Sequence, residues 1–192
     1  MARNRRTATV YWDACCFISV LSNERNAKDC LKVVKAAEDG HIRIVTSSIS
    51  LVEVIKYNGK PPIAEADQSK VDAAMSGSHF EIRNVDRLTG QLARRLIWEK
   101  DLAVKDSIHV ATALLAGVRE LHTTDKDLLK LSPLEFEGYG PLRIQRPDWI
   151  DPSSPEALGI RSLFEEAEEV EEVDASAPDG SADDSEEGED RI

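Results

Sequence analysis

The sequence predicts a three-layer α/β/α domain around a central, mainly parallel sheet, followed by a disordered acidic tail. Apolar runs that suit buried strands alternate with segments of helical period as far as about residue 150. Helical segments, rather than short hairpin turns, separate the first four strands, which favours parallel crossovers with helices on both faces of the sheet. After residue 150 the apolar runs give way to a stretch dominated by acidic residues.

In the first half, β-branched and aromatic residues in "TATVYWD" predict a strand over 7–13. "NAKDCLKVVKAAEDG" (26–40) is typical of a helix, with Asn26 as its N-cap and Gly40 as its stop. "HIRIVTSS" (41–48) is a second strand, and helices are expected over 49–58 and, after two prolines, over 64–77.

In the second half, "HFEIRNV" (79–85) predicts the third strand. A helix over 87–100 follows, in which leucines recur at i, i+4 spacing, and another over 104–117 ends at a glycine. "RELHTTD" (119–125) is the fourth strand and "PLRIQR" (141–146) a short fifth.

Charge divides the chain into a domain at 1–150 and a tail at 151–192. The tail holds 16 acidic residues and two arginines, which leaves 20 acidic and 22 basic residues in the domain. The net charge of −12 therefore averages a tail of −14 and a domain of +2, and it does not exclude a polyanionic partner. We expect the tail to be largely disordered.

The cysteines and the hydropathy predict a cytoplasmic protein. Cys15, Cys16 and Cys30 are odd in number and lack C-x-x-C spacing, so they suggest neither a disulfide framework nor a zinc site. No stretch approaches 18 apolar residues, and no export signal follows the basic start, so a membrane is not an expected partner.

Acidic residues fall where the predicted strands end. Asp13 ends the first strand and Asp125 the fourth, and Asp127 lies two residues further on. Glu53 is in the first turns of the helix after the second strand, and Asp106 begins the helix that leads into the fourth. Since ligands of such sheets bind at the carboxyl ends of the strands, these carboxylates are expected to converge there.

Converging carboxylates raise one another's pKa unless a cation compensates their charge. Mg²⁺ and Mn²⁺ prefer carboxylate and water oxygens, and such ions activate a water molecule and stabilise the leaving oxygen of a phosphodiester. The residue types therefore suit metal-dependent phosphodiester hydrolysis.

Each acid also has a purely structural interpretation. Asp13 suits a cap of the following turn, and Ser50 with Glu53 forms a capping-box pattern. Asp106 gains stability from the dipole of its helix, and Asp127 suits an N-cap of "KDLLKL". Their common position at one edge of one sheet favours a site.

Four motifs in this order resemble the PIN-domain family, in particular the VapC-type toxins of bacterial toxin–antitoxin pairs. They are "VYWDACCFI", "TSSISLVEV", "KDSIHVATALLAG" and "LHTTDKDLLKL", and the resemblance that they carry extends over residues 8 to about 147. The resemblance implies a PIN fold and an endoribonuclease that depends on Mg²⁺ or Mn²⁺ and is paired with a protein antitoxin. It implies that Asp13, Glu53, Asp106 and Asp125 are the catalytic metal ligands, with Asp127 auxiliary.

The resemblance also draws attention to three neighbouring residues. Thr123 matches a position that often carries a hydroxyl near the metal. Cys15 departs from the family, which frequently has Asn or Ser there to hold the first acid, and a thiol is a weak hydrogen-bonding group. His109 lies one turn after Asp106; a packed histidine bonded to a backbone carbonyl is favoured over a general base.

Basic residues near the acids are candidates for contacts with RNA phosphates. They are Arg94, Arg95, Lys100 and Lys105 before Asp106, and Lys126 and Lys130 around Asp127. Ordinary solvated helix faces explain each of them equally well. The acidic tail is either a solubilising extension or a segment that competes with RNA at this basic rim.

Two other functions remain open at this point. A non-catalytic PIN-like module that binds RNA or protein fits the Cys15 departure, while a haloacid-dehalogenase-type phosphatase normally needs a second Asp where this chain has Cys15. We also expect that the domain forms a homodimer, because domains of this kind often pair.

Overall fold

The computed structural model describes residues 7–55, 69, 71–73 and 75–150. Five parallel strands form one sheet in the order β3-β2-β1-β4-β5, so the predicted parallel α/β architecture is confirmed. All five strands lie within predicted ranges. They are β1 (Ala8–Trp12), β2 (Ile42–Ser47), β3 (Phe80–Arg83), β4 (Glu120–His122) and β5 (Arg143–Gln145).

Helices connect the strands, and most begin where the sequence predicts. An unexpected one, α1, directly follows Asp13, and α3 ends after four residues although a helix was expected over 49–58. The helices are α1 (Ala14–Leu21), α2 (Ala27–Glu38), α3 (Ser50–Glu53), α5 (Arg87–Lys100), α6 (Val104–Leu115) and α7 (Lys126–Leu129).

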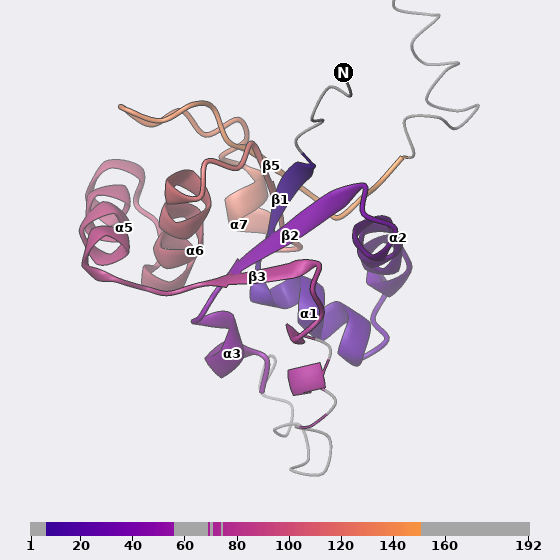
Figure 1. The fold of residues 1–192 in the computed structure, drawn as a ribbon. Coiled ribbons are helices and arrows are strands. Elements are labelled where there is room, and N and C mark those ends of the chain that lie inside the picture. Colours follow the sequence, from indigo (N-terminus) through magenta and orange to yellow (C-terminus); the bar gives the residue numbers. More distant parts are fainter. Residues whose placement is uncertain (1–6, 56–68, 70, 74, 151–192) are drawn as a thin grey trace, which may run out of the picture. The chain divides into compact units, whose positions relative to one another are not determined.

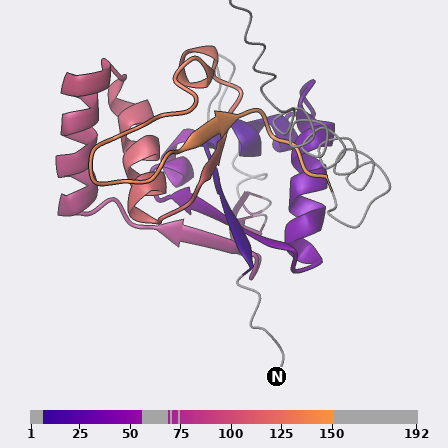
Figure 2. The same ribbon diagram turned by 90° about the horizontal axis from the view of Figure 1, so that it is seen from above.

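The sheet lies between two helical layers, as Figure 1 shows: α1 and α2 cover one face, and α5 and α6 the other. The view from above in Figure 2 keeps the pink pair α5 and α6 opposite the purple helices. Side chains alternate along β1, so Tyr11 packs with α5 and α6 while Val10 and Trp12 pack with α1 and α2. Two apolar clusters thus hold the three layers together.

The carboxyl edge of the sheet is where β1 and β4 both end. Trp12 of β1 lies beside His122 of β4, so Asp13 and Thr123 leave the sheet next to each other. The backbone N–H of Asp13 still donates to the carbonyl of His122 at 3.2 Å. This register brings together two segments that are 110 residues apart in sequence.

Some expectations concern residues outside the described part of the chain. Of the helix expected over 64–77, residues 69, 71–73 and 75 are described and helical, whereas Ser76 and Gly77 are described and lie outside the helix. The acidic tail at 151–192 lies outside the described residues. Within the described residues, no helix has both the length and the apolar character needed to cross a membrane.

Candidate active site

An open cavity of about 790 Å³ lies at the carboxyl edge of the sheet and collects all five predicted acids. They arrive from separate segments: the end of β1, α3, the first turn of α6, the loop from β4 into α7, and the first turn of α7. Lys105 and Lys126 line the same cavity. The acidic lining residues are Asp13, Glu53, Asp106, Asp125 and Asp127.

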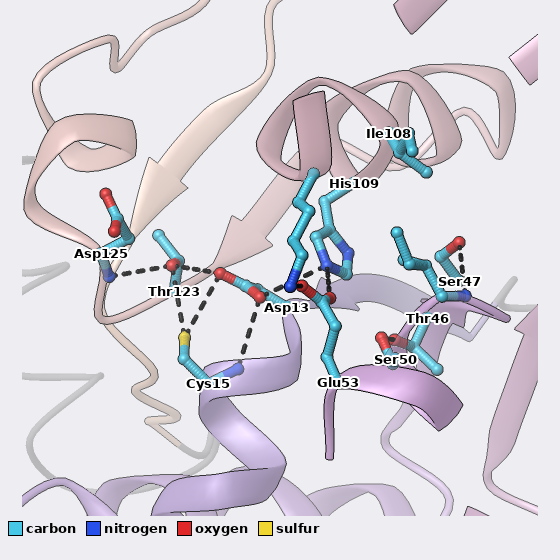
Figure 3. Close-up of polar contacts among 12 residues, drawn as sticks. Asp13, Cys15, Thr46, Ser47, Ser50, Glu53, Ile108, His109, Thr123 and Asp125 are labelled. Atoms are coloured by element: carbon cyan, nitrogen blue, oxygen red, sulfur yellow. Dashed lines mark hydrogen bonds and ion pairs between the residues drawn. The ribbon is translucent and has the colours of Figure 1, made fainter. Parts of the chain in front are cut away.

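Asp13 is held by groups that donate hydrogen bonds to its carboxylate. It is only 8% exposed, and the hydroxyl of Thr123 donates to its Oδ2 at 2.7 Å (Figure 3). Its Oδ1 accepts from the backbone N–H of Cys15 at 3.3 Å, which caps α1. Asp13 is therefore both a helix cap and a fixed wall of the cavity.

The thiol of Cys15 takes part in the same network. Its Sγ donates to Asp13 Oδ2 at 3.3 Å and accepts from the backbone N–H of Thr124 at 3.1 Å. Thr123 Oγ1 in turn accepts from the backbone N–H of Asp125 at 3.0 Å. The residue that departs from the family pattern thus still supports the first acid, although a thiol is a weak partner.

Asp125 is the N-cap of α7. Its Oδ1 accepts from the backbone N–H groups of Asp127 and Leu128 at 2.7 and 3.0 Å. Asp127, the cap suggested by sequence, lies inside the first turn instead, and its carboxylate pairs with Lys130 at 2.6 Å. Asp127 is exposed, so it lies at the rim of the cavity rather than at its base.

Glu53 faces the cavity because the suggested capping box is not formed. Ile49 occupies the N-cap position of α3, and the hydroxyl of Ser50 bonds to Thr46 at 2.8 Å. The Glu53 carboxylate instead contacts His109 Nε2 at 2.7 Å and Lys105 Nζ at 3.2 Å. Burial raises the pKa of Glu53, but the hydrogen bond to His109 and the pairing with Lys105 outweigh burial and lower it.

His109 lies beneath the acids, with only 1% of its surface exposed. Its partners are not the backbone carbonyl expected from sequence: Nε2 contacts Glu53 and lies 3.6 Å from Asp13 Oδ1, and Nδ1 lies 2.8 Å from the Tyr11 hydroxyl. Burial lowers the pKa of His109, but the Glu53 hydrogen bond and the negative charges of Asp13 and Asp106 raise it overall. The neighbouring carboxylates thus favour the protonated form of the imidazole.

The pKa of Asp106 indicates that the negative charge of the cavity is not fully compensated. Burial, together with the negative charges of Asp125 and Asp13, raises the pKa of Asp106 to about 6. His109 acts in the opposite sense but does not cancel them. The site therefore favours a cation or a proton near Asp106.

The chemistry of these donors suits a hard divalent cation, since carboxylate oxygens are the ligands that Mg²⁺ and Mn²⁺ prefer. Within the residues described, however, no three His, Cys, Asp or Glu side chains are arranged closely enough to hold a metal ion. Glu53 is engaged by Lys105 and His109. Metal binding by these carboxylates would therefore require their side chains to move closer together.

The remaining basic candidates lie outside the cavity lining. Arg94 stacks over Trp98, and Arg95 pairs with Glu99 at 3.1 Å and stacks over Phe136. The contribution of His109 and Tyr11 was not evident from sequence, although the one-turn spacing of His109 from Asp106 was a signal. No feature of the sequence pointed to Tyr11 as a site residue, because Tyr11 lies within a predicted buried strand.

A parallel α/β/α fold with acids gathered at the carboxyl edge of its sheet defines the class of this protein. Residues 10–132 match the family model of the PIN domain, and the chain belongs to that family. At the level of the family, this membership supports a nuclease.

Three solved structures are similar to this chain. VapC20 of Mycobacterium tuberculosis, a toxin that cleaves the sarcin–ricin loop, is 12% identical; the match covers 70% of this chain and 98% of that one, with a TM-score of 0.50. A toxin–antitoxin complex from Klebsiella pneumoniae matches at 25% identity, over 65% and 92% of the two chains, with a TM-score of 0.48. VapBC2 from Rickettsia felis, bound to a promoter DNA fragment, matches at 19% identity, over 73% and 99%, with a TM-score of 0.48. The search of curated proteins finds no match.

Proposed function

We propose that this protein is a metal-dependent endoribonuclease that hydrolyses RNA phosphodiester bonds. The observation that carries the proposal is the gathering of Asp13, Glu53, Asp106 and Asp125 around one open cavity. The raised pKa of Asp106 supports it, because like charges so placed favour a bound cation. Membership of the PIN domain family supports the same reaction.

Mg²⁺ or Mn²⁺ is the proposed cofactor, held by Asp13, Glu53, Asp106 and Asp125, with Asp127 as an auxiliary group at the rim. When bound, such an ion activates a water molecule and stabilises the charge that develops on the phosphodiester. Thr123 and Cys15 keep the Asp13 carboxylate fixed through their hydrogen bonds to Oδ2. A fixed ligand loses less conformational freedom on binding than a mobile one.

The phosphate must approach a strongly acidic cavity, so positive charge at the rim is required. Lys105 and Lys126 line the cavity and are proposed to contact the RNA backbone. Lys105 is 68% exposed and is paired with Glu53. Engagement of Glu53 elsewhere would free the Lys105 ammonium for a phosphate.

We further propose that the ribonuclease is the toxin of a toxin–antitoxin pair that acts in the cytoplasm. The four motifs that resemble VapC-type toxins support this role. Expression of the chain alone should slow growth of its host, and a protein antitoxin should relieve the effect. An Asp13→Asn variant expressed to the same level should not slow growth; equal growth inhibition by this variant would contradict the toxin role.

The first test is cleavage of total cellular RNA by the purified full chain with Mg²⁺ or Mn²⁺, beside the same reaction with EDTA. We expect discrete fragments that EDTA abolishes. The Asp13→Asn/Asp106→Asn double variant should produce none, because both substitutions remove ligand charge while retaining shape. An Asp86→Asn variant is the matched control, since Asp86 caps α5 and does not line the cavity.

The result that contradicts the proposal is equally specific. If folded protein in the presence of either ion leaves RNA intact but still binds it, the chain is a non-catalytic PIN-like binding module.

A further inference from the structure

The outer face of α5 carries a stripe of basic, polar and aromatic side chains. Arg87, Gln91, Arg94 and Trp98 follow one another at i, i+4, i+7 and i+11, which places them on one side of a helix. All four are exposed, whereas the opposite side of α5 is buried in the core. We name these four residues the α5 stripe.

Trp98 is the most exposed large apolar side chain of the described residues, at 74%. The guanidinium carbon of Arg94 lies 5.3 Å from the centroid of its ring, which is the geometry of a cation–π pair. In the described part of the chain, neither Arg87 nor Arg94 has a carboxylate partner. The stripe thus presents an aromatic surface beside positive charge that no acid among the described residues neutralises.

The stripe leads toward the acidic cavity. α5 ends at Lys100 and α6 begins at Val104, so Trp98 and the cavity-lining pair Lys105 and Asp106 flank the same short turn. The two helices also pack against each other. A chain that leaves the cavity past Lys105 would therefore reach Trp98 next.

We propose that the α5 stripe binds single-stranded RNA next to the scissile bond, with a base stacked on Trp98 and phosphates paired with Arg94 and Arg87. This inference rests on the proposed function and adds to it a substrate class, since stacking requires an unpaired base. A second copy of the chain is a poorer occupant, because a symmetric contact through the stripe would bring its arginines together. Arg95 is not part of the stripe, as Glu99 and Glu137 already neutralise it.

The test is RNA binding by the full chain in EDTA, where metal-dependent cleavage is suppressed. The probe is a labelled oligoadenylate of about 12 nucleotides, a length within the range that such surfaces bind. We expect Trp98→Ala to weaken binding by about 5- to 100-fold, as loss of one base stack does. Trp98→Phe should restore most of the affinity, because a phenyl ring also stacks.

Arg94→Ala should act through charge. It should lower the slope of log affinity against log salt by about 0.7, the value for one phosphate contact on a single strand. Lys28→Ala and Leu31→Ala are the matched controls, because both residues are exposed on α2, across the sheet from α5. Both controls should bind as the unaltered chain does.

The proposal is overturned if Trp98→Ala and Arg94→Ala bind the probe within twofold of the unaltered chain. It is also overturned if Trp98→Ala alters the oligomeric state in sedimentation but not RNA affinity, which would make the stripe a contact between copies. Failure of the proposed function looks different: RNA would bind through the stripe, yet Mg²⁺ or Mn²⁺ would produce no cleavage.

Discussion

Hydrogen bonds, rather than a close basic partner, hold the buried carboxylate of Asp13 in place. Thr123, Cys15 and the backbone N–H of Cys15 all donate to it, and His109 lies further away at 3.6 Å. Such hydrogen bonds fix the position of the carboxylate without pairing it with a close cation. The carboxylate therefore remains available to a cation from the cavity side.

Thr123 is the strongest of these donors, and its replacement provides a test at the scale of one residue. Thr123→Val keeps the shape but leaves Asp13 Oδ2 with Cys15 alone, so we expect a loss of about 2 kcal/mol in the free energy of unfolding. Thr123→Ser keeps the hydroxyl and should lose less than about 1 kcal/mol. Urea unfolding with unchanged m-values measures both. Equal midpoints for the two variants would contradict this role of Thr123.

At the scale of the element, the sequence predicts all five strands, and α2, α5 and α6 within a few residues. Helix α1 was missed because "ACCFISVL" is apolar except for Ser19 and shows neither helical nor alternating period. Its helical state follows from the Asp13 cap, whose role depends on how β1 ends. Asp13 and Asp125 were evident as candidates from their place at strand ends, and Glu53 and Asp106 from their place in the first turns of helices at the same edge. The contacts of His109 with Glu53 and Tyr11, in contrast, depend on packing between layers.

Helix caps allow the structural and chemical roles of an acid to be separated. Asp125 caps α7 and lines the cavity, and Asn caps a helix about as well as Asp. Asp125→Asn should therefore unfold within about 0.5 kcal/mol of the unaltered chain, yet lose cleavage because it removes charge from the cavity. Asp125→Ala should lose cleavage and also about 1 kcal/mol of stability. Urea unfolding and RNA cleavage, measured on the same preparations, provide both readouts.

The matched control for these variants is Asp86→Ala. Asp86 caps α5 through the backbone N–H of Thr89 and does not line the cavity. It should also lose about 1 kcal/mol of stability, while cleavage of RNA is retained. Unimpaired cleavage by Asp125→Asn would show that the charge of Asp125 is not needed.

At the scale of the whole molecule, the net negative charge opposes binding of the proposed RNA substrate. Residues 1–150 have a net charge of +2, and residues 151–192 have a net charge of −14. On the proposed function, the positive charge of the α5 stripe and of the rim lysines attracts RNA locally, whereas the total charge of −12 repels it at long range. The two effects differ in range, so salt separates them.

Truncation of the chain after Ile150 removes the long-range repulsion. It keeps both apolar clusters, because the last residue in either cluster is Trp149. We expect it to bind the oligoadenylate more tightly than the full chain at low salt, because association is no longer opposed by the tail. The difference should vanish near 1 M salt, where the screening length is about 3 Å. Anisotropy titrations of both chains over a salt series provide the measurement. Equal affinities at low salt would show that the tail neither repels nor competes with RNA, and would leave it the role of a solubilising extension.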